Sequence, residues 1–136
     1  MKKEILGLRL IQNSKNHLID KMTLAKITEE IRKFRDERDW MQFHNAKDMA
    51  IAITIEASEL AEQFLWKSQV EIEKKIKDDP DSITDEIADV GIYLFELADN
   101  LGIDIIEAMH AKLKKNAIKY PILKSKGSNL KYTDLD

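Results

Sequence analysis

The sequence predicts an all-α fold, and two features of its 136 residues indicate this. Only four glycines and two prolines interrupt the chain, and no run of alternating β-branched residues is bounded by turn signals. Long segments instead repeat apolar residues at the three- and four-residue spacing that places side chains on one face of a helix. We therefore expect a helical bundle with about four main helices.

The first two helices are recognised by their capping residues. Thr23 is suited to cap a helix that reaches about Arg38 and carries an apolar stripe from Leu24 to Phe34. The segment "DWMQFHN" then breaks the period. Asn45 is suited to cap a long second helix that continues to about Lys67.

Breakers and caps also divide the second half of the chain. A short charged helix, "QVEIEKKIKDD", is expected to end at Pro80, and Asp81 or Ser82 starts the next long helix. Gly102 follows that helix at a position suited to a left-handed C-cap. Asp104 caps the last helix, which is expected to end near the second proline.

These elements predict three segments. Residues 1–22 form an N-terminal extension of unknown role, residues 23–121 form the helical bundle, and residues 122–136 form a C-terminal tail. The tail has no helical period and is expected to be extended or partly mobile.

Composition narrows the function classes and the compartment. Charged residues make up 35% of the chain but the net charge is −3, which does not favour binding to nucleic acid. Cysteine is absent, which excludes disulfides and thiolate metal sites and suits the cytoplasm. Glu4, Arg9 and a polar run interrupt any signal-peptide core at the N-terminus, so no membrane association is expected.

The long second helix carries acidic residues on its apolar face. At about 100° per residue, Glu56 falls among Met49, Ile53 and Leu60, and Glu59 lies about 60° round the helix. Glu62 would lie further toward the edge. Glu56 therefore points where a core residue is expected.

The other long helix repeats this arrangement. Glu86 falls among Ile83, Val90 and Leu97, and Asp89 lies about 60° away. Neither helix brings enough lysine or arginine to neutralise the carboxylates, and burial of unpaired charges is costly. Hard oxygen ligands favour Mg²⁺ or Mn²⁺, so Glu56, Glu59, Glu86 and Asp89 are predicted metal ligands.

Other interpretations of these acidic patterns stay open. The same spacing is common on solvated helix faces in a chain this rich in charge. Glu107 and His110 form an E-x-x-H, but a ferritin-like di-iron bundle would need a second copy, which is missing. A helical module that binds nucleotide without turnover, or one that only oligomerises, would also fit the periodicity.

The motifs and their flanks resemble the MazG-like all-α nucleoside triphosphate pyrophosphohydrolases. E-x-x-E at 56–59 and E-x-x-D at 86–89 match the family signature, and "FRDERDWMQFHNAKDMAIAITIEASELAEQFLWK", "DEIADVGIYLFELADNLGID" and "SKGSNLKYTDLD" resemble the dCTP pyrophosphatase branch. The resemblance runs from about Ile31 to the C-terminus.

This resemblance implies hydrolysis of a nucleoside triphosphate, dCTP or a related pyrimidine nucleotide, to the monophosphate and pyrophosphate, as nucleotide-pool cleansing. It implies Mg²⁺ at the four carboxylates. One of the four could act as general base, and Glu56 is expected to do so because it is the most deeply placed. Related proteins form homodimers or dimers of dimers with sites built across subunits, so a homo-oligomer is expected here.

The resemblance also implies residues that contact the substrate. Trp40, Trp66 and Tyr93 match positions that line the nucleotide pocket, although each could also serve as core or interface filler. His44 is interpreted as a surface histidine rather than a ligand. The expected substrate contacts on the last helix are Lys112, Asn116, Lys119 and Tyr120.

The sequence departs from the animal dCTP enzymes at two places. Ile31 stands where they have a histidine, which removes a ring partner for the base. Asp48 stands where they have an asparagine, which adds a negative charge near a helix N-terminus, and this change is expected to be structural. Lys124 and Lys126 are further, weaker candidates for contact with the substrate.

Overall fold

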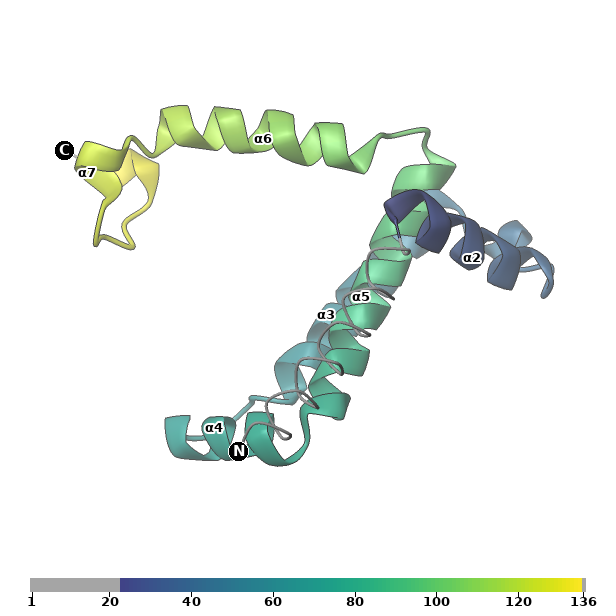
Figure 1. The fold of residues 1–136 in the computed structure, drawn as a ribbon, viewed down its shortest axis with the longest axis horizontal. Helices are drawn as coiled ribbons and strands as arrows, with labels where there is room; N and C mark the ends of the chain where they lie inside the picture. The colour runs from purple at the N-terminus through teal and green to yellow at the C-terminus, as the bar shows by residue number, and fades with distance from the viewer. Residues whose placement is uncertain (1–22, 136) are drawn as a thin grey trace, which may run out of the picture. The chain divides into compact units, whose positions relative to one another are not determined.

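The computed structural model describes residues 23–135, and this part of the chain contains helices and no strand (Figure 1). The predicted all-α class is therefore confirmed. No helix in the described range is both long and apolar enough to span a membrane. The elements are α2 (Leu24–Asp36), η1 (Met41–Phe43), α3 (Ala46–Glu62), α4 (Gln69–Asp78), α5 (Pro80–Asn100), α6 (Ile105–Lys119), α7 (Ile122–Ser125) and η2 (Tyr132–Asp134).

The chain divides into two units, Met1–Leu97 and Ala98–Asp136, and α5 runs across the boundary. The predicted N-terminal extension, residues 1–22, lies outside the described residues. The segment boundaries proposed from the sequence stay predictions.

The predicted caps of the first two long helices are confirmed. The Thr23 side chain accepts a hydrogen bond from the Lys26 backbone N–H, and the Asn45 side chain accepts one from the Asp48 backbone N–H. Asp48 also accepts from the Asn45 side-chain amide, which lowers its pKa. Its charge therefore sits in the first turn of α3, where it complements the helix dipole.

The junction between α4 and α5 differs from the prediction. The charged helix was expected to end at Pro80 and the next to start at Asp81 or Ser82, but α4 ends at Asp78 and Pro80 is the first residue of α5. The missing N–H of proline costs nothing at this position, and its fixed φ suits a first turn. Asp79 serves both helices, because it closes α4 and its side chain accepts from the Ser82 backbone N–H at 3.5 Å.

Both long helices of the first unit end or begin within a few residues of expectation. The largest difference is at the end of α3, which stops at Glu62, short of the predicted Lys67. Trp66 has a φ of 59°, a left-handed conformation that no helix can continue through.

Contacts between α3 and α5 show that the two helices run antiparallel. Gln63 near the end of α3 donates to Glu86 near the start of α5, while His44, just before α3, contacts Glu96 late in α5. The helices lie side by side in Figure 1. Met49 on α3 is 1% exposed, the deepest large apolar side chain of the described range.

The second unit begins with the end of α5. Gly102 has a φ of 65°; its N–H bonds the Asp99 carbonyl, and the Ile103 N–H bonds the Ala98 carbonyl. This is a Schellman motif, which confirms the predicted glycine C-cap. The Asp104 side chain caps α6 as predicted, by accepting from the Glu107 N–H.

The tail was expected to be extended, and this was wrong in part. Its backbone forms the one-turn helix α7 and the short η2. The ring of Tyr132 packs edge-on against Tyr120 with centroids 5.9 Å apart, and the Lys119 ammonium lies 4.8 Å from the Tyr132 centroid. These contacts tie η2 to the end of α6, which the helical period alone does not encode.

Candidate functional site

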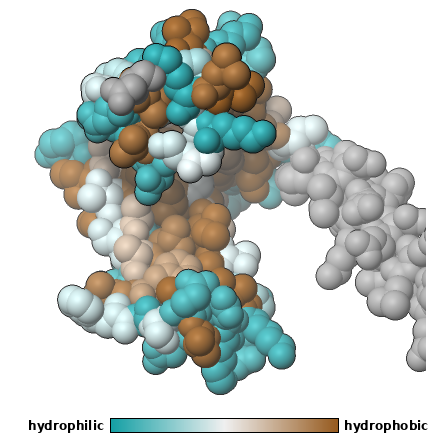
Figure 2. Space-filling view, turned by 90° about the vertical axis from the view of Figure 1, so that its left-hand side faces the viewer, coloured by the Kyte–Doolittle hydropathy of each residue, from teal (hydrophilic) through white to brown (hydrophobic). Residues whose placement is uncertain are grey.

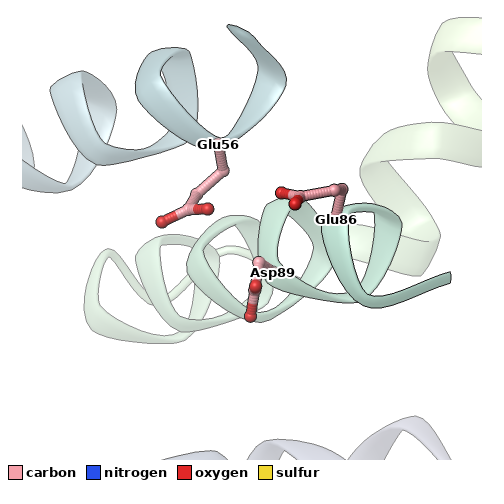
Figure 3. Close-up of side chains that lie close together, drawn as sticks. All are labelled: Glu56, Glu86 and Asp89. Carbon is pink, nitrogen blue, oxygen red and sulfur yellow. The ribbon is translucent and has the colours of Figure 1, made fainter. Parts of the chain in front are cut away.

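An acidic cluster lies between α3 and α5. Glu56 points from α3 toward α5, where Glu86 and Asp89 lie one turn apart (Figure 3). Each of the three residues offers a carboxylate oxygen, and these oxygens all lie within 4.8 Å of one another. The antiparallel helices thus bring together carboxylates that are far apart in the sequence.

The close approach of these carboxylates has an electrostatic cost. Burial raises the pKa of Glu56, and the charges of Glu59, Asp89 and Glu86 raise it further. The pKa of Glu86 is raised for the same reasons, first by burial and then by Glu59 and Asp89. The proximity of these negative charges therefore favours protonation of Glu56 and Glu86 unless a cation binds beside them.

One carboxylate oxygen of this cluster lacks a hydrogen-bond partner among the described residues. The Oε2 atom of Glu86 is buried and has no hydrogen bond, and Oε1 has only a long one, 3.5 Å, from the Gln63 amide. A buried acceptor in that state is costly. The donor set is all carboxylate oxygen, which fits a hard divalent cation, and the three carboxylates can hold one.

Glu59, the fourth predicted ligand, is placed differently. Its side chain is exposed and lies outside the group of oxygens described above. Its charge still acts on the cluster, because it raises the pKa of both Glu56 and Glu86. Glu59 therefore lies at the edge of the cluster.

A pocket of about 390 Å³ lies in the same unit and shares Asp89 with the acidic cluster. Its walls come from α2, from the residues on either side of η1, and from α5. The lining residues are Ile27, Glu30, Ile31, Phe34, Arg35, Trp40, His44, Asp89, Ile92, Tyr93 and Glu96. The pocket is thus largely apolar and aromatic with a few charged residues, as a small-molecule site usually is.

Aromatic rings form a connected wall of this pocket. Trp40 packs edge-on against Phe34 with centroids 5.8 Å apart, and lies 6.1 Å from the His44 ring. His44 in turn lies 6.3 Å from Tyr93. Burial, followed by the charges of Glu56 and Glu96, raises the pKa of Tyr93, which keeps its hydroxyl protonated. Such a wall can pack against a flat ring.

The interpretation of His44 as a surface histidine was wrong. Its side chain is 16% exposed, and Nδ1 lies 2.6 Å from Oε1 of Glu96, which is 4% exposed. Nη1 of Arg35, also buried, lies 3.6 Å from the same oxygen. These three residues form a buried polar network in the pocket wall.

The other predicted substrate residues fall in two places. Trp66 belongs to the first unit but is 93% exposed and does not line the pocket. Lys112, Asn116, Lys119 and Tyr120 belong to the second unit. Within it, the Lys112 side chain lines a shallow apolar depression beside Met109.

The sequence interpretation missed Arg35 and Glu96. Glu96 interrupts the apolar run "YLFELA" on α5, seven residues after Asp89. Because seven residues make about two helical turns, that spacing places it on the same face as Asp89. An acidic residue at this spacing inside an apolar run was the available signal.

Comparison with known proteins bears on this combination of fold and site. The sequence profile of the MazG-like family matches residues 51–135, a range that holds all the carboxylates of the cluster. The chain belongs to the MazG-like family.

Two proteins with related sequences belong to mammals. The MazG-like chain is 38% identical to dCTP pyrophosphatase 1 of Mus musculus over 115 residues, which cover 83% of this chain and 68% of the mouse protein. Identity to the human protein of the same name is 35% over the same length and coverage.

The fold matches a solved structure as well. A pyrophosphatase from Archaeoglobus fulgidus superposes with a TM-score of 0.68 at 40% sequence identity. The match covers 71% of this chain and 91% of the archaeal one. The predicted family and helical fold are therefore confirmed.

Proposed function

We propose that this MazG-like chain hydrolyses a nucleoside triphosphate, dCTP foremost, to the monophosphate and pyrophosphate. The observation that carries the proposal is the junction of the acidic cluster with the aromatic pocket at Asp89. A nucleotide has the same two parts, a charged phosphate chain and a flat base. Relatives named dCTP pyrophosphatase 1, at 35–38% identity, support the substrate and the reaction.

Glu56, Glu86 and Asp89, with Glu59 beside them, are the proposed ligands of Mg²⁺, with Mn²⁺ as a substitute. Their oxygens are the hard ligand atoms that these cations prefer. The raised pKa values of Glu56 and Glu86 show that the ionised carboxylates repel one another, and a bound cation would offset this repulsion. A bound Mg²⁺ supplies neutralisation of the phosphate oxygens and acidification of water.

Glu56 is the proposed general base. Glu56 points from α3 toward Glu86 and Asp89 (Figure 3), so a water held at the cluster would lie beside a carboxylate that can accept its proton. The proton moves from that water to a Glu56 oxygen as the water attacks the α-phosphorus. The bond to the bridging oxygen breaks, and pyrophosphate leaves.

The aromatic residues are proposed to hold the base. Trp40 and Tyr93 both line the pocket. Trp66, Lys112, Asn116, Lys119 and Tyr120 are proposed substrate contacts on the strength of the resemblance, with the lysines matching phosphate oxygens by charge. The net charge of −3 supports a nucleotide rather than a nucleic acid as the partner.

The chain is proposed to act as a homodimer or homotetramer in the cytoplasm. Large apolar side chains stay more than half exposed on both central helices, and Figure 2 shows hydrophobic residues at the surface. Examples are Ile51 and Ile55 on α3 and Ile87 on α5. Exposure on this scale favours association. Light scattering that returned the monomer mass of 15.8 kDa would refute the assembly.

Product analysis tests the proposed reaction. Incubation with dCTP and Mg²⁺ is expected to give dCMP and pyrophosphate in equal amounts, with no dCDP. Asp89→Asn is expected to lose both turnover and cation binding, because Asp89 belongs to the cluster and borders the pocket. An Asp89→Asn variant with full turnover would refute the site.

A further inference from the structure

Glu96 is the most deeply buried carboxylate that lines the pocket. It is 4% exposed, and both of its ionic contacts use Oε1: Nδ1 of His44 at 2.6 Å and Nη1 of Arg35 at 3.6 Å. An ionised carboxylate only accepts hydrogen bonds, so in that form of Glu96 the donor at 2.6 Å is Nδ1 of His44. The Arg35 guanidinium and the His44 ring therefore both lie against one oxygen of Glu96 in the pocket wall.

The second oxygen of Glu96 is in a different state. No residue in the range 23–135 hydrogen-bonds Oε2, although Glu96 lines the pocket. Because Glu96 lines an open pocket, this oxygen can accept a hydrogen bond from water or from a ligand that enters the pocket. Oε2 is thus an acceptor offered to whatever fills the pocket.

The position of Glu96 also matters. It lies seven residues after Asp89 on α5, a rise of about 10 Å along the helix. A nucleotide with its phosphates at the acidic cluster would extend along this helix, so its base would reach the part of the pocket that His44 and Glu96 line.

We propose that Glu96 determines base specificity by accepting a hydrogen bond at Oε2 from the exocyclic amino group of the base. This inference rests on the proposed function and deepens it. Among pyrimidines, cytosine presents an amino group at position 4, whereas uracil and thymine present a carbonyl oxygen there. Two acceptors that face each other repel, and the carboxylate would be left without a donor.

Discrimination of this kind is strong because it acts through a buried charged group. Hydrogen bonds to charged groups contribute more than neutral ones, and a site that must leave a polar group unpaired rejects the wrong substrate. Loss of one such bond corresponds to roughly a tenfold to hundredfold change in relative kcat/KM. The aromatic wall can pack against either pyrimidine ring, so it does not discriminate between cytosine and uracil.

The test compares dCTP with dUTP, which differ at this edge of the ring, using the full chain. Wild type is expected to favour dCTP in kcat/KM. In Glu96→Gln, an amide that can donate replaces the acceptor, and the ratio of kcat/KM for dCTP over dUTP is expected to fall at least about tenfold. If Glu96 had a purely structural role, the substitution would lower kcat/KM for dCTP and dUTP by the same factor and leave their ratio unchanged.

Asp36→Asn is the matched control. The half-exposed Asp36 also binds Arg35, at 2.7 Å, but does not line the pocket. Its loss is expected to leave the dCTP to dUTP ratio at the wild-type value. A ratio that stays constant in Glu96→Gln, or changes as much in Asp36→Asn, would overturn the inference.

Binding separates this inference from the proposed function. Calorimetry with dCMP and dUMP needs no turnover, and wild type is expected to bind dCMP at least about tenfold more tightly, with the preference lost in Glu96→Gln. If wild type hydrolyses no triphosphate but shows this preference, the proposed reaction fails and the role of Glu96 stands. Equal binding of dCMP and dUMP by wild type would overturn the role of Glu96.

Discussion

Glu56 on α3 and Glu86 on α5 present carboxylate oxygens within 4.8 Å of each other, and Asp89 completes the cluster. The pKa of each glutamate is raised by burial and by its acidic neighbours. A divalent cation bound beside the pocket would offset the repulsion between these carboxylates, and we propose that the cluster binds one.

Neutral substitutions in the cluster are expected to abolish turnover while the fold survives. Glu56→Gln and Glu86→Gln each keep the side-chain volume but remove a proposed ligand. We expect kcat to fall at least about a hundredfold in each, with an unchanged helical circular dichroism spectrum. Glu62→Gln is the control, because Glu62 is exposed on the same helix and outside the group of oxygens. Near-normal activity in either cluster variant would disprove the metal assignment.

Mg²⁺ or Mn²⁺ alone is expected to raise the melting temperature. A ligand that binds only the folded state stabilises it by about 2.7 kcal/mol at a hundred times its dissociation constant. Glu86→Gln should lose this increase, because the partnerless Oε2 of Glu86 is removed from the cluster. Scanning calorimetry with and without a chelator measures the effect. An equal increase in the variant would place the cation elsewhere.

In the metal-free protein, the contribution of Glu56 and Glu86 to stability is expected to fall as pH rises through the acidic range. Glu56 and Glu86 have folded pKa values above the ordinary 4.5, so the folded state binds protons more tightly than the unfolded state. Their stabilising effect is present below pH 4.5 and disappears as pH rises through the raised pKa values.

Glutamine mimics the protonated acid, which gives this pH prediction a control. The double variant Glu56→Gln, Glu86→Gln should gain stability relative to wild type as pH rises from 4 to about 7 in chelator, and should match it at the acidic end. Urea unfolding at a series of pH values measures this difference. A difference that does not vary with pH would contradict the raised pKa values.

Trp40→Ala is expected to raise KM for the nucleotide with little change in kcat. Trp40 lines the pocket and contacts Phe34 and His44 through its ring. Aromatic stacking on a base contributes about 1–3 kcal/mol, so KM should rise roughly tenfold or more. Trp40→Phe keeps a ring and should recover most of the affinity. A change in kcat alone would assign Trp40 a different role.

Sequence reasoning recovered the features that depend on local chemistry. Thr23, Asn45, Asp104 and Gly102 were expected as caps and act as caps, because capping depends on a few adjacent residues. Glu56, Glu86 and Asp89 were grouped from helical periodicity, and the antiparallel pairing of α3 with α5 brings them together.

The features that were missed depend on contacts between distant segments. His44 is largely covered because it lies against Glu96 on α5, and no local pattern encodes this contact. Arg35 joins the network from α2. Trp66 matches a motif but is exposed, because the left-handed backbone at that residue follows the end of α3.

The most direct test of the central claim is turnover of a full panel of ribo- and deoxynucleoside triphosphates with Mg²⁺, with all products separated. The account predicts monophosphate and pyrophosphate, with dCTP as the best substrate. Diphosphate and phosphate as products, or no product from any triphosphate, would contradict it.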